Sequence, residues 1–114
     1  MKIENSKTQM RRGILEFCIL ALLRGREMYP SEIMSNLSQA QLIVVEGTLY
    51  PLLTRLKNEG YLQYRWEESK SGPPRKYYQL TDTGISLFEE LKVTWSEMII
   101  AVNSITSQNQ TNNE

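Results

Sequence analysis

The feature that most constrains this fold is an amphipathic segment followed at once by an alternating one, within residues 46–80. Apolar residues in the first part recur at i, i+3, i+4 and i+7, which places them on one face of a helix. The second part alternates apolar or aromatic residues with polar ones, as in a half-buried strand pair. The sequence therefore predicts a helix that runs directly into a β-hairpin. The helix carries Leu49, Leu52, Leu53 and Leu56, and the strands carry Leu62, Tyr64 and Trp66, then Tyr77, Tyr78 and Leu80.

The ends of the predicted helix follow from proline and glycine. Proline lacks an N–H and is tolerated in a first helical turn, so Pro51 predicts a start near Gly47 or Thr48. Gly60 is expected to stop the helix. Its outer face has hydroxyls and cations that suit contact with phosphates and base edges. The residues of this face expected to contact DNA are Thr48, Tyr50, Pro51, Thr54 and Arg55.

The predicted hairpin has a stiff, basic tip. Residues 68–74 contain Ser-Gly-Pro-Pro, which restricts the backbone of the turn, and Arg75 and Lys76 follow at once. A charged turn is usually just solvated, but here it lies beside a helix with a basic outer face. This layout is that of a winged helix-turn-helix, in which one helix enters a DNA groove.

The sequence resembles the PadR-like transcriptional regulators. The motif beginning Gly47-Thr48-Leu49-Tyr50-Pro51, the wing string from Gly72 to Tyr78 and the preceding Tyr29-Pro30 segment carry this resemblance over most of residues 10–85. The family's usual small residue after that tyrosine is Pro30 here. The resemblance implies a dimeric regulator, most often a repressor, whose helix beginning near Gly47 reads the major groove. It also implies that Arg75 and Lys76 grip the DNA backbone or minor groove.

Charge is unevenly distributed although the formal net charge is zero. Residues 1–81 hold twelve basic and eight acidic side chains, whereas residues 82–114 hold one basic and five acidic. This asymmetry fits a cationic DNA face and a remote acidic region. We expect residues 1–80 to form the DNA-binding domain with its N-terminal helix, 81–106 a dimerisation helix and 107–114 a disordered tail.

Composition argues against an enzyme or a metalloprotein. The chain has no histidine and a single cysteine, which excludes histidine triads, histidine metal sites and an intrachain disulfide. Cys18 lies in an apolar run and is interpreted as a buried reduced thiol in preference to a redox sensor. That run is too short to span a bilayer and lacks a signal-peptide pattern, so a cytoplasmic protein without cofactors is expected.

The last predicted helix carries a coiled-coil-like apolar seam. Its apolar residues alternate steps of three and four, and such a stripe needs a partner, most simply the same helix of a second copy. Thr81 is expected to cap the start of the helix. The dimerisation residues are Phe88, Leu91, Trp95, Met98, Val102 and Ile105.

Trp95 has two interpretations that the sequence leaves open. It fills the dimer core, or it lines a site where two symmetry-related indoles sandwich a planar aromatic ligand, with Met98 adapting to the ligand's shape. The second interpretation also follows from resemblance, because small PadR-like regulators with one C-terminal helix include multidrug sensors with a similar Trp-Ser sequence, here Trp95-Ser96.

The sequence thus predicts a mainly α fold with a β-hairpin wing (α+β), with a long C-terminal dimerisation helix. The predicted function is sequence-specific binding to a double-stranded DNA operator as a homodimer that represses transcription, with relief by a planar aromatic effector left open. The alternative is a winged-helix protein-interaction module with no effector. No paired carboxylates, nucleophile with base, or phosphate loop indicates catalysis.

Overall fold

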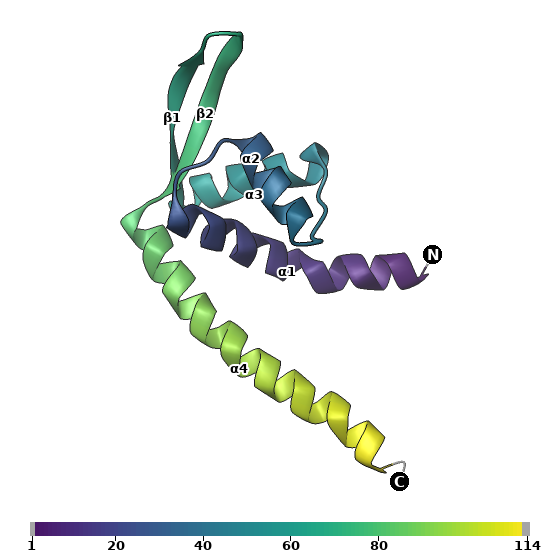
Figure 1. Cartoon of the computed structure of the whole chain (residues 1–114). Helices are drawn as coiled ribbons and strands as arrows, with labels where there is room; N and C mark the ends of the chain where they lie inside the picture. The colour runs from purple at the N-terminus through teal and green to yellow at the C-terminus, as the bar shows by residue number, and fades with distance from the viewer. Residues whose placement is uncertain (1, 113–114) are drawn as a thin grey trace.

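The computed structural model describes residues 2–112 and contains, over that range, four helices and one two-stranded hairpin. The hairpin, here called the wing, projects from a body formed by the first three helices, and the last helix runs away from it (Figure 1). This arrangement confirms the predicted fold class. The elements are α1 (Lys2–Gly25), α2 (Pro30–Gln39), α3 (Glu46–Asn58), β1 (Leu62–Ser69), β2 (Gly72–Leu80) and α4 (Asp82–Asn112).

One apolar core joins the helices to the base of the wing. Helices α1, α2 and α3 each contribute residues spaced three or four apart, which buries one face of each helix, and α4 contributes one residue. Burying such a side chain contributes roughly 1.5–3 kcal/mol. The core includes Ile19, Leu20 and Leu23 of α1, Ile33 and Leu37 of α2, Leu49, Leu53 and Leu56 of α3, Leu62 and Tyr78 of the wing, and Phe88 of α4.

Helix α3 begins earlier than its proline suggested. The carbonyl of Val45 accepts hydrogen bonds from the N–H groups of Thr48 and Leu49, both at 3.0 Å, so the helix starts at Glu46. Pro51 therefore lies inside the helix instead of in its first turn. It faces solvent and removes only the hydrogen bond that the carbonyl of Gly47 would otherwise accept.

The end of α3 is the glycine stop that the sequence predicted. Gly60 has a φ of +90°, a conformation that glycine adopts without steric cost. Its N–H donates to the carbonyl of Lys57 at 3.0 Å, and the N–H of Tyr61 donates to that of Leu56 at 2.9 Å. These two hydrogen bonds form a Schellman motif, which turns the chain directly into β1.

The two wing strands are antiparallel and anchored to the body at their base. Tyr64 pairs with Tyr78, and Trp66 pairs with Lys76, so these four side chains share one face of the wing. Met28 adds a short bridge to β2, because its N–H and carbonyl bond with Tyr78 at 3.1 and 2.8 Å. The loop before α2 thus fixes the wing against the body.

Thr81 caps α4 as expected, since its hydroxyl oxygen accepts the N–H of Gly84 at 3.0 Å. The helix continues to Asn112, beyond the end expected at residue 106. No proline or glycine interrupts residues 107–112, so a polar sequence alone does not end the helix. Residues 113–114 of the expected tail lie outside the described residues.

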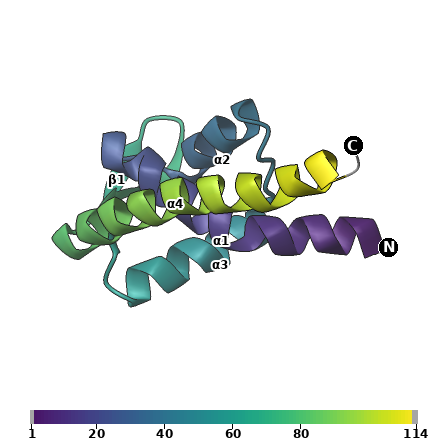
Figure 2. The ribbon, with the colours of Figure 1, turned by 90° about the horizontal axis from the view of Figure 1, so that it is seen from below.

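Helices α1 and α4 diverge along their lengths. They are close where Arg24 forms an ion pair with Glu89 at 3.6 Å, and from there they separate toward the two chain termini (Figure 1). Seen from below, α4 passes under the body, with α2 and α3 on opposite sides of its course (Figure 2). The distal half of α4 is therefore far from the core of its own chain.

Candidate nucleic-acid interface

The exposed face of α3 is divided between two hollows. Tyr50 borders one of about 340 Å³ between α3, the start of α2 and the wing, here called the wing hollow. Thr48, Pro51 and Arg55 border a second hollow of about 450 Å³, whose other wall is the N-terminal half of α1. Thr54 is exposed on the same helix. The wing hollow is also lined by Tyr29, Pro30, Ser31, Trp66, Arg75 and Lys76.

The two expected wing cations lie over aromatic rings. The guanidinium carbon of Arg75 is 4.5 Å from the ring centroid of Tyr29, and the ammonium of Lys76 is 4.5 Å from that of Tyr64. Such contacts orient long side chains that would otherwise be mobile. Both cations line the wing hollow, although their consecutive positions on β2 place them on opposite faces of the wing.

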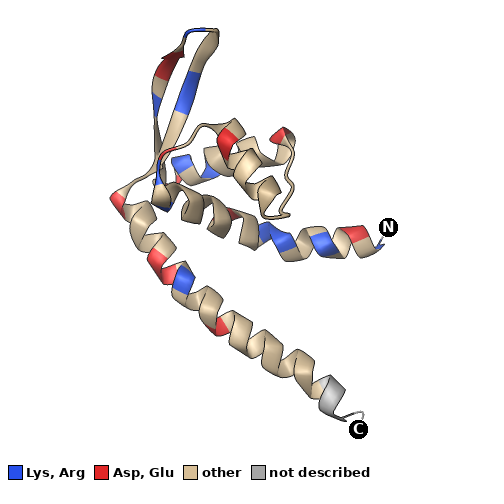
Figure 3. Ribbon diagram, viewed as in Figure 1, with Lys and Arg blue, Asp and Glu red and all other residues tan. Residues whose placement is uncertain are grey.

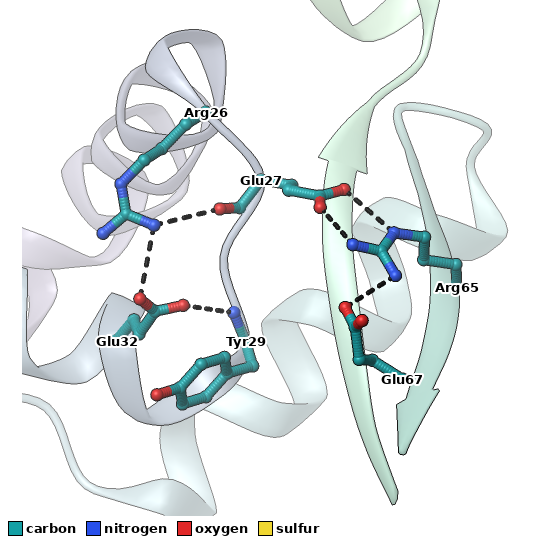
Figure 4. Close-up of polar contacts among 6 residues, drawn as sticks. All are labelled: Arg26, Glu27, Tyr29, Glu32, Arg65 and Glu67. Carbon is teal, nitrogen blue, oxygen red and sulfur yellow. Dashed lines mark hydrogen bonds and ion pairs between the residues drawn. The ribbon is translucent and has the colours of Figure 1, made fainter. Parts of the chain in front are cut away.

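The face of the wing that carries Arg75 also holds a set of internal ion pairs centred on Arg65. Arg65 forms ion pairs with Glu27 at 2.5 Å and with Glu67 at 2.7 Å, linking β1 to the loop before α2 (Figure 4). The hydrogen bond from Arg65 lowers the pKa of Glu27 below its usual range, which keeps this carboxylate charged. Glu67 and Glu27 are thus engaged by a cation of their own chain.

A connected set of polar contacts fixes the start of α2. Glu32 accepts a hydrogen bond from the N–H of Tyr29 at 3.1 Å and one from Arg26 at 3.2 Å (Figure 4). The first contact satisfies a donor at the helix N-terminus. The tyrosine that stacks with Arg75 is therefore positioned by α2 itself.

Arg55 is engaged within the chain, which its sequence position did not reveal. Its guanidinium forms an ion pair with Glu16 of α1 and a second with Glu59 at 3.5 Å. The Glu16 carboxylate raises the pKa of Arg55, whose side chain remains 57% exposed. The structure places Arg55 beside α1 and not beside the wing, so its contact with DNA stays a prediction.

Sequence reasoning did not select Trp66 or Lys57 as site residues. Trp66 is 61% exposed and borders the wing hollow beside Lys76. Lys57 lies with its ammonium 5.8 Å from the ring centroid of Tyr64. The alternation along β1 places Tyr64 and Trp66 on one face of the wing. The position of Trp66 opposite Lys76 was the signal that could have assigned Trp66 to the site.

Charged residues cluster by element. Lysine and arginine mark the N-terminal half of α1, the wing carries both cations and carboxylates, and acidic residues are prominent in the first half of α4 (Figure 3). The described part of the chain thus separates a basic region beside α3 from an acidic one on α4, as the sequence analysis expected. The basic N-terminal half of α1 forms one wall of the second hollow through Arg12.

A separate apolar groove lies between α1 and α4, here called the seam groove. It has a volume of about 290 Å³, and Trp95 and Met98 line it from α4. Trp95 is 37% exposed, and its ring centroid is 6.2 Å from that of Phe17 on α1. The groove is also lined by Met10, Gly13, Ile14 and Leu91.

The exposure of the predicted seam residues on α4 increases along the helix. Phe88 is only 9% exposed and stacks with Phe17 at 5.8 Å, so it belongs chiefly to the core of its own chain. Val102 and Ile105 are 52% and 64% exposed. The part of the seam open to a partner therefore begins near Leu91, which is half-buried.

Cys18 is a half-buried thiol against the core, and burial raises its pKa, which favours an inert residue. Within residues 2–112, no helix is long and apolar enough to cross a membrane. Among the same residues, no group of three histidine, cysteine or acidic side chains is placed to hold a metal ion.

Comparison with known proteins gives consistent matches. The family model described as "Transcriptional regulator PadR-like family" matches residues 19–90. A PadR-like transcription factor structure from Bacteroides fragilis is 56% identical, with a TM-score of 0.76 over 89% of this chain and 98% of that one. A PadR-like regulator from Bacillus cereus is 38% identical, with a TM-score of 0.77 over 85% and 95%. Bacillus subtilis PadR, solved with operator DNA, is 28% identical, with a TM-score of 0.66 over 70% of this chain and 46% of that one.

Proposed function

We propose that this chain, which belongs to the PadR-like family of transcriptional regulators, represses transcription by binding an operator as a homodimer. The family is one of DNA-binding regulators and not of enzymes, which confirms that part of the sequence-based expectation. The proposal adds repression, the dimer and release by a planar aromatic compound to this family assignment.

One observation carries the DNA part of the proposal: α3 and the wing meet around a single hollow whose rim is cationic. Tyr50 enters it from the N-terminal half of α3, and Arg75 and Lys76 enter it from the wing. Among the described residues, those lining the wing hollow include no carboxylate. A duplex with α3 in its major groove would place its backbone against this rim.

The exposed half of α4 supports a homodimer. Met98, Val102 and Ile105 are each more than half exposed in the single chain. They follow one stripe of the helix, and two-fold dimers bury the same surface of both copies. Two copies of α3 related in this way would read two half-sites of an operator.

The seam groove supports a ligand-relieved repressor. Its lining is largely apolar, and Trp95 presents an indole that is neither fully buried nor fully free. An aromatic compound stacked there would release DNA only if it favours one spacing of the two α3 helices over another. Planar aromatic cations and phenols fit this chemistry best.

The test begins with selection of bound sequences from a pool of random duplexes. We expect enrichment of a two-fold symmetric sequence whose half-sites lie about one helical turn or a multiple of it apart. Binding to unselected duplex should weaken steeply with salt, since phosphate contacts release counterions. Placed across a promoter, the enriched sequence should lower reporter expression when the protein is present.

The outcomes separate the alternatives. No salt-dependent binding and no enriched sequence would favour the protein-interaction module. An enriched sequence that raises reporter expression would overturn repression while leaving DNA binding intact.

The effector has its own test. A panel of planar aromatic cations and phenols should change Trp95 emission and release the selected duplex. If no compound of the panel has either effect, the proposed effector is wrong.

A further inference from the structure

The most exposed aromatic side chain of the wing is Trp66, which is not among the DNA contacts expected from the sequence. Trp66 is 61% exposed although it lies in the middle of β1. Its ring is edge-on to Tyr64, with centroids 6.1 Å apart and planes at 88°. An indole this exposed leaves much apolar surface in water, which costs free energy until a partner covers it.

The surroundings of Trp66 indicate where such a partner would lie. The indole borders the wing hollow, which Tyr50 of α3 and Pro30 of α2 also line. Tyr50 is itself 45% exposed. A ligand that α3 reads from its N-terminal turns must therefore pass beside Trp66, and contact with the wing continues the α3 surface without a break.

Charge indicates the chemistry of this partner. The Lys76 ammonium lies 5.3 Å from the indole centroid and Arg75 lies next to it along β2. Glu67, on the opposite wing face, is paired with Arg65. Glu68 and Trp66 both line a separate hollow toward the tip, but Glu68 does not line the wing hollow. Within residues 2–112, the indole therefore has two cations and no carboxylate as neighbours in the wing hollow, which fits a polyanion with apolar sugar walls.

We propose that Trp66 is a DNA-contacting residue that packs its indole against the deoxyribose wall of the backbone flanking the major-groove segment read by α3. Lys76 meets a phosphate of the same strand, so the pair supplies one apolar and one ionic contact. This inference rests on the proposed function, because it requires duplex DNA to lie across the wing hollow. The contact is independent of base sequence, since sugars and phosphates are the same at every position.

The chain offers a direct spectroscopic test, since Trp66 and Trp95 are its two tryptophans. The Trp95→Phe protein reports Trp66 alone, and Trp66→Phe reports Trp95 alone. Each is titrated with a mixed-sequence duplex at low salt, and quenching by neutral acrylamide is measured with and without DNA. We expect the duplex to lower the quenching constant of Trp66 at least twofold and to leave that of Trp95 nearly unchanged.

Affinity measurements separate the apolar contact from the ionic one. Trp66→Ala should weaken binding to mixed-sequence duplex about tenfold at fixed salt, with an unchanged salt slope, because no phosphate contact is lost. Trp66→Phe should recover most of the loss. Lys76→Ala should instead flatten the salt slope by about one unit. If Trp95→Phe impairs duplex binding, the wild-type minus Trp66→Phe difference spectrum gives the Trp66 signal.

The possible results are distinguishable. If the wild type binds duplex but Trp66 stays equally accessible to acrylamide and Trp66→Ala binds like wild type, the Trp66 contact is wrong and the proposed function stands. If the wild type binds no duplex, both fail. If Trp66→Ala changes the salt slope as Lys76→Ala does, Trp66 acts by holding the lysine and not by touching DNA.

Discussion

At the residue scale, the junction of α3, the wing and α4 depends on a few small groups. The Thr81 hydroxyl donates to the carbonyl of Gly60 at 2.6 Å while its oxygen accepts the N–H of Gly84. Gly60 supplies the left-handed conformation that ends α3. One hydroxyl thus ties the end of α3 to the start of α4. The direction of α4 relative to α3 is set here, and with it the spacing of the two α3 helices in the proposed dimer.

Gly84→Ala tests this junction. A Cβ at Gly84 would lie 2.1 Å from the carbonyl oxygen of Tyr61, so the backbone of α4 or of the wing must shift. We expect a loss of about 1–3 kcal/mol in the free energy of unfolding, measured by thermal and denaturant unfolding. Gly13→Ala is the matched control in α1, because its Cβ would meet nothing within 4 Å. The control should be neutral or stabilising by up to about 1 kcal/mol. Equal melting of both variants would contradict the close approach.

Arg75→Ala tests the wing cation held by an aromatic ring. The guanidinium is exposed and lies over Tyr29, so the fold should persist while affinity for any duplex falls. The slope of log affinity against log salt should flatten by about one unit if one phosphate contact is lost. Lys92→Ala, which removes an exposed cation from α4, should leave both quantities unchanged. Unchanged binding by Arg75→Ala would exclude this residue from the interface.

At the element scale, the spacing of residues in the sequence predicted those features that depend on near neighbours along the chain. The stripe on α3, the stop at Gly60, the alternation in β1 and the cap at Thr81 each depend on near neighbours, and the structure has all four. The start of α3 was placed too late, because Val45 offers the first accepting carbonyl a turn before Pro51. The partner of Arg55 could not be predicted, since Glu16 lies 39 positions away along the chain.

The Glu16–Arg55 ion pair links α1 to α3. Two models of Arg55 predict different effects on DNA affinity when this pair is removed. If Arg55 contacts phosphate, Glu16 competes for it, and Glu16→Gln should raise affinity for mixed-sequence duplex a few fold and steepen the salt slope by up to about one unit. If Arg55 is only a brace, DNA binding should stay constant and the melting temperature should fall slightly. Following the sequence-based prediction, we expect the first result.

The matched control for this experiment is Glu89→Gln. Glu89 lies on α4, away from α3, and the substitution breaks its ion pair with Arg24 of α1. It changes net charge equally and so corrects for nonspecific electrostatics. A similar gain in affinity for both variants would mean that the effect comes from net charge and not from release of Arg55.

At the scale of the whole molecule, the single chain is more extended than a compact domain of its length. Its radius of gyration is 17.0 Å, and its extents are 63 × 34 × 22 Å. A compact domain of similar length would have a radius of gyration of about 13 Å. The difference comes from α4, whose distal half exposes large apolar residues such as Val102 and Ile105. A second copy that fills the angle between α1 and α4 would complete the core.

Val102→Glu tests this requirement. A carboxylate at a buried dimer seam is costly to desolvate, so we expect the dimer to dissociate in sedimentation experiments and operator affinity to fall with it. Ser104→Glu places the same charge on the opposite side of α4, about 200° around the helix at 100° per residue. It should leave the dimer intact. A dimeric Val102→Glu protein would show that another surface joins the two copies.

The proposed dimer and the proposed effector make opposite demands on the Trp95 side chain. A tryptophan that only fills a closed seam should cost about 3–5 kcal/mol when cut to alanine. The groove beside Trp95 has about 290 Å³ of space even with the indole in place, so we expect Trp95→Ala to cost less than this range. The main loss should instead be the response of duplex binding to planar aromatic compounds, and Trp95→Phe should keep part of that response. Emission from Trp95 in the Trp66→Phe protein reports ligand entry directly. A strongly destabilised Trp95→Ala protein, together with compounds that change neither emission nor duplex binding, would leave Trp95 as a packing residue and the seam groove as space that the second chain fills.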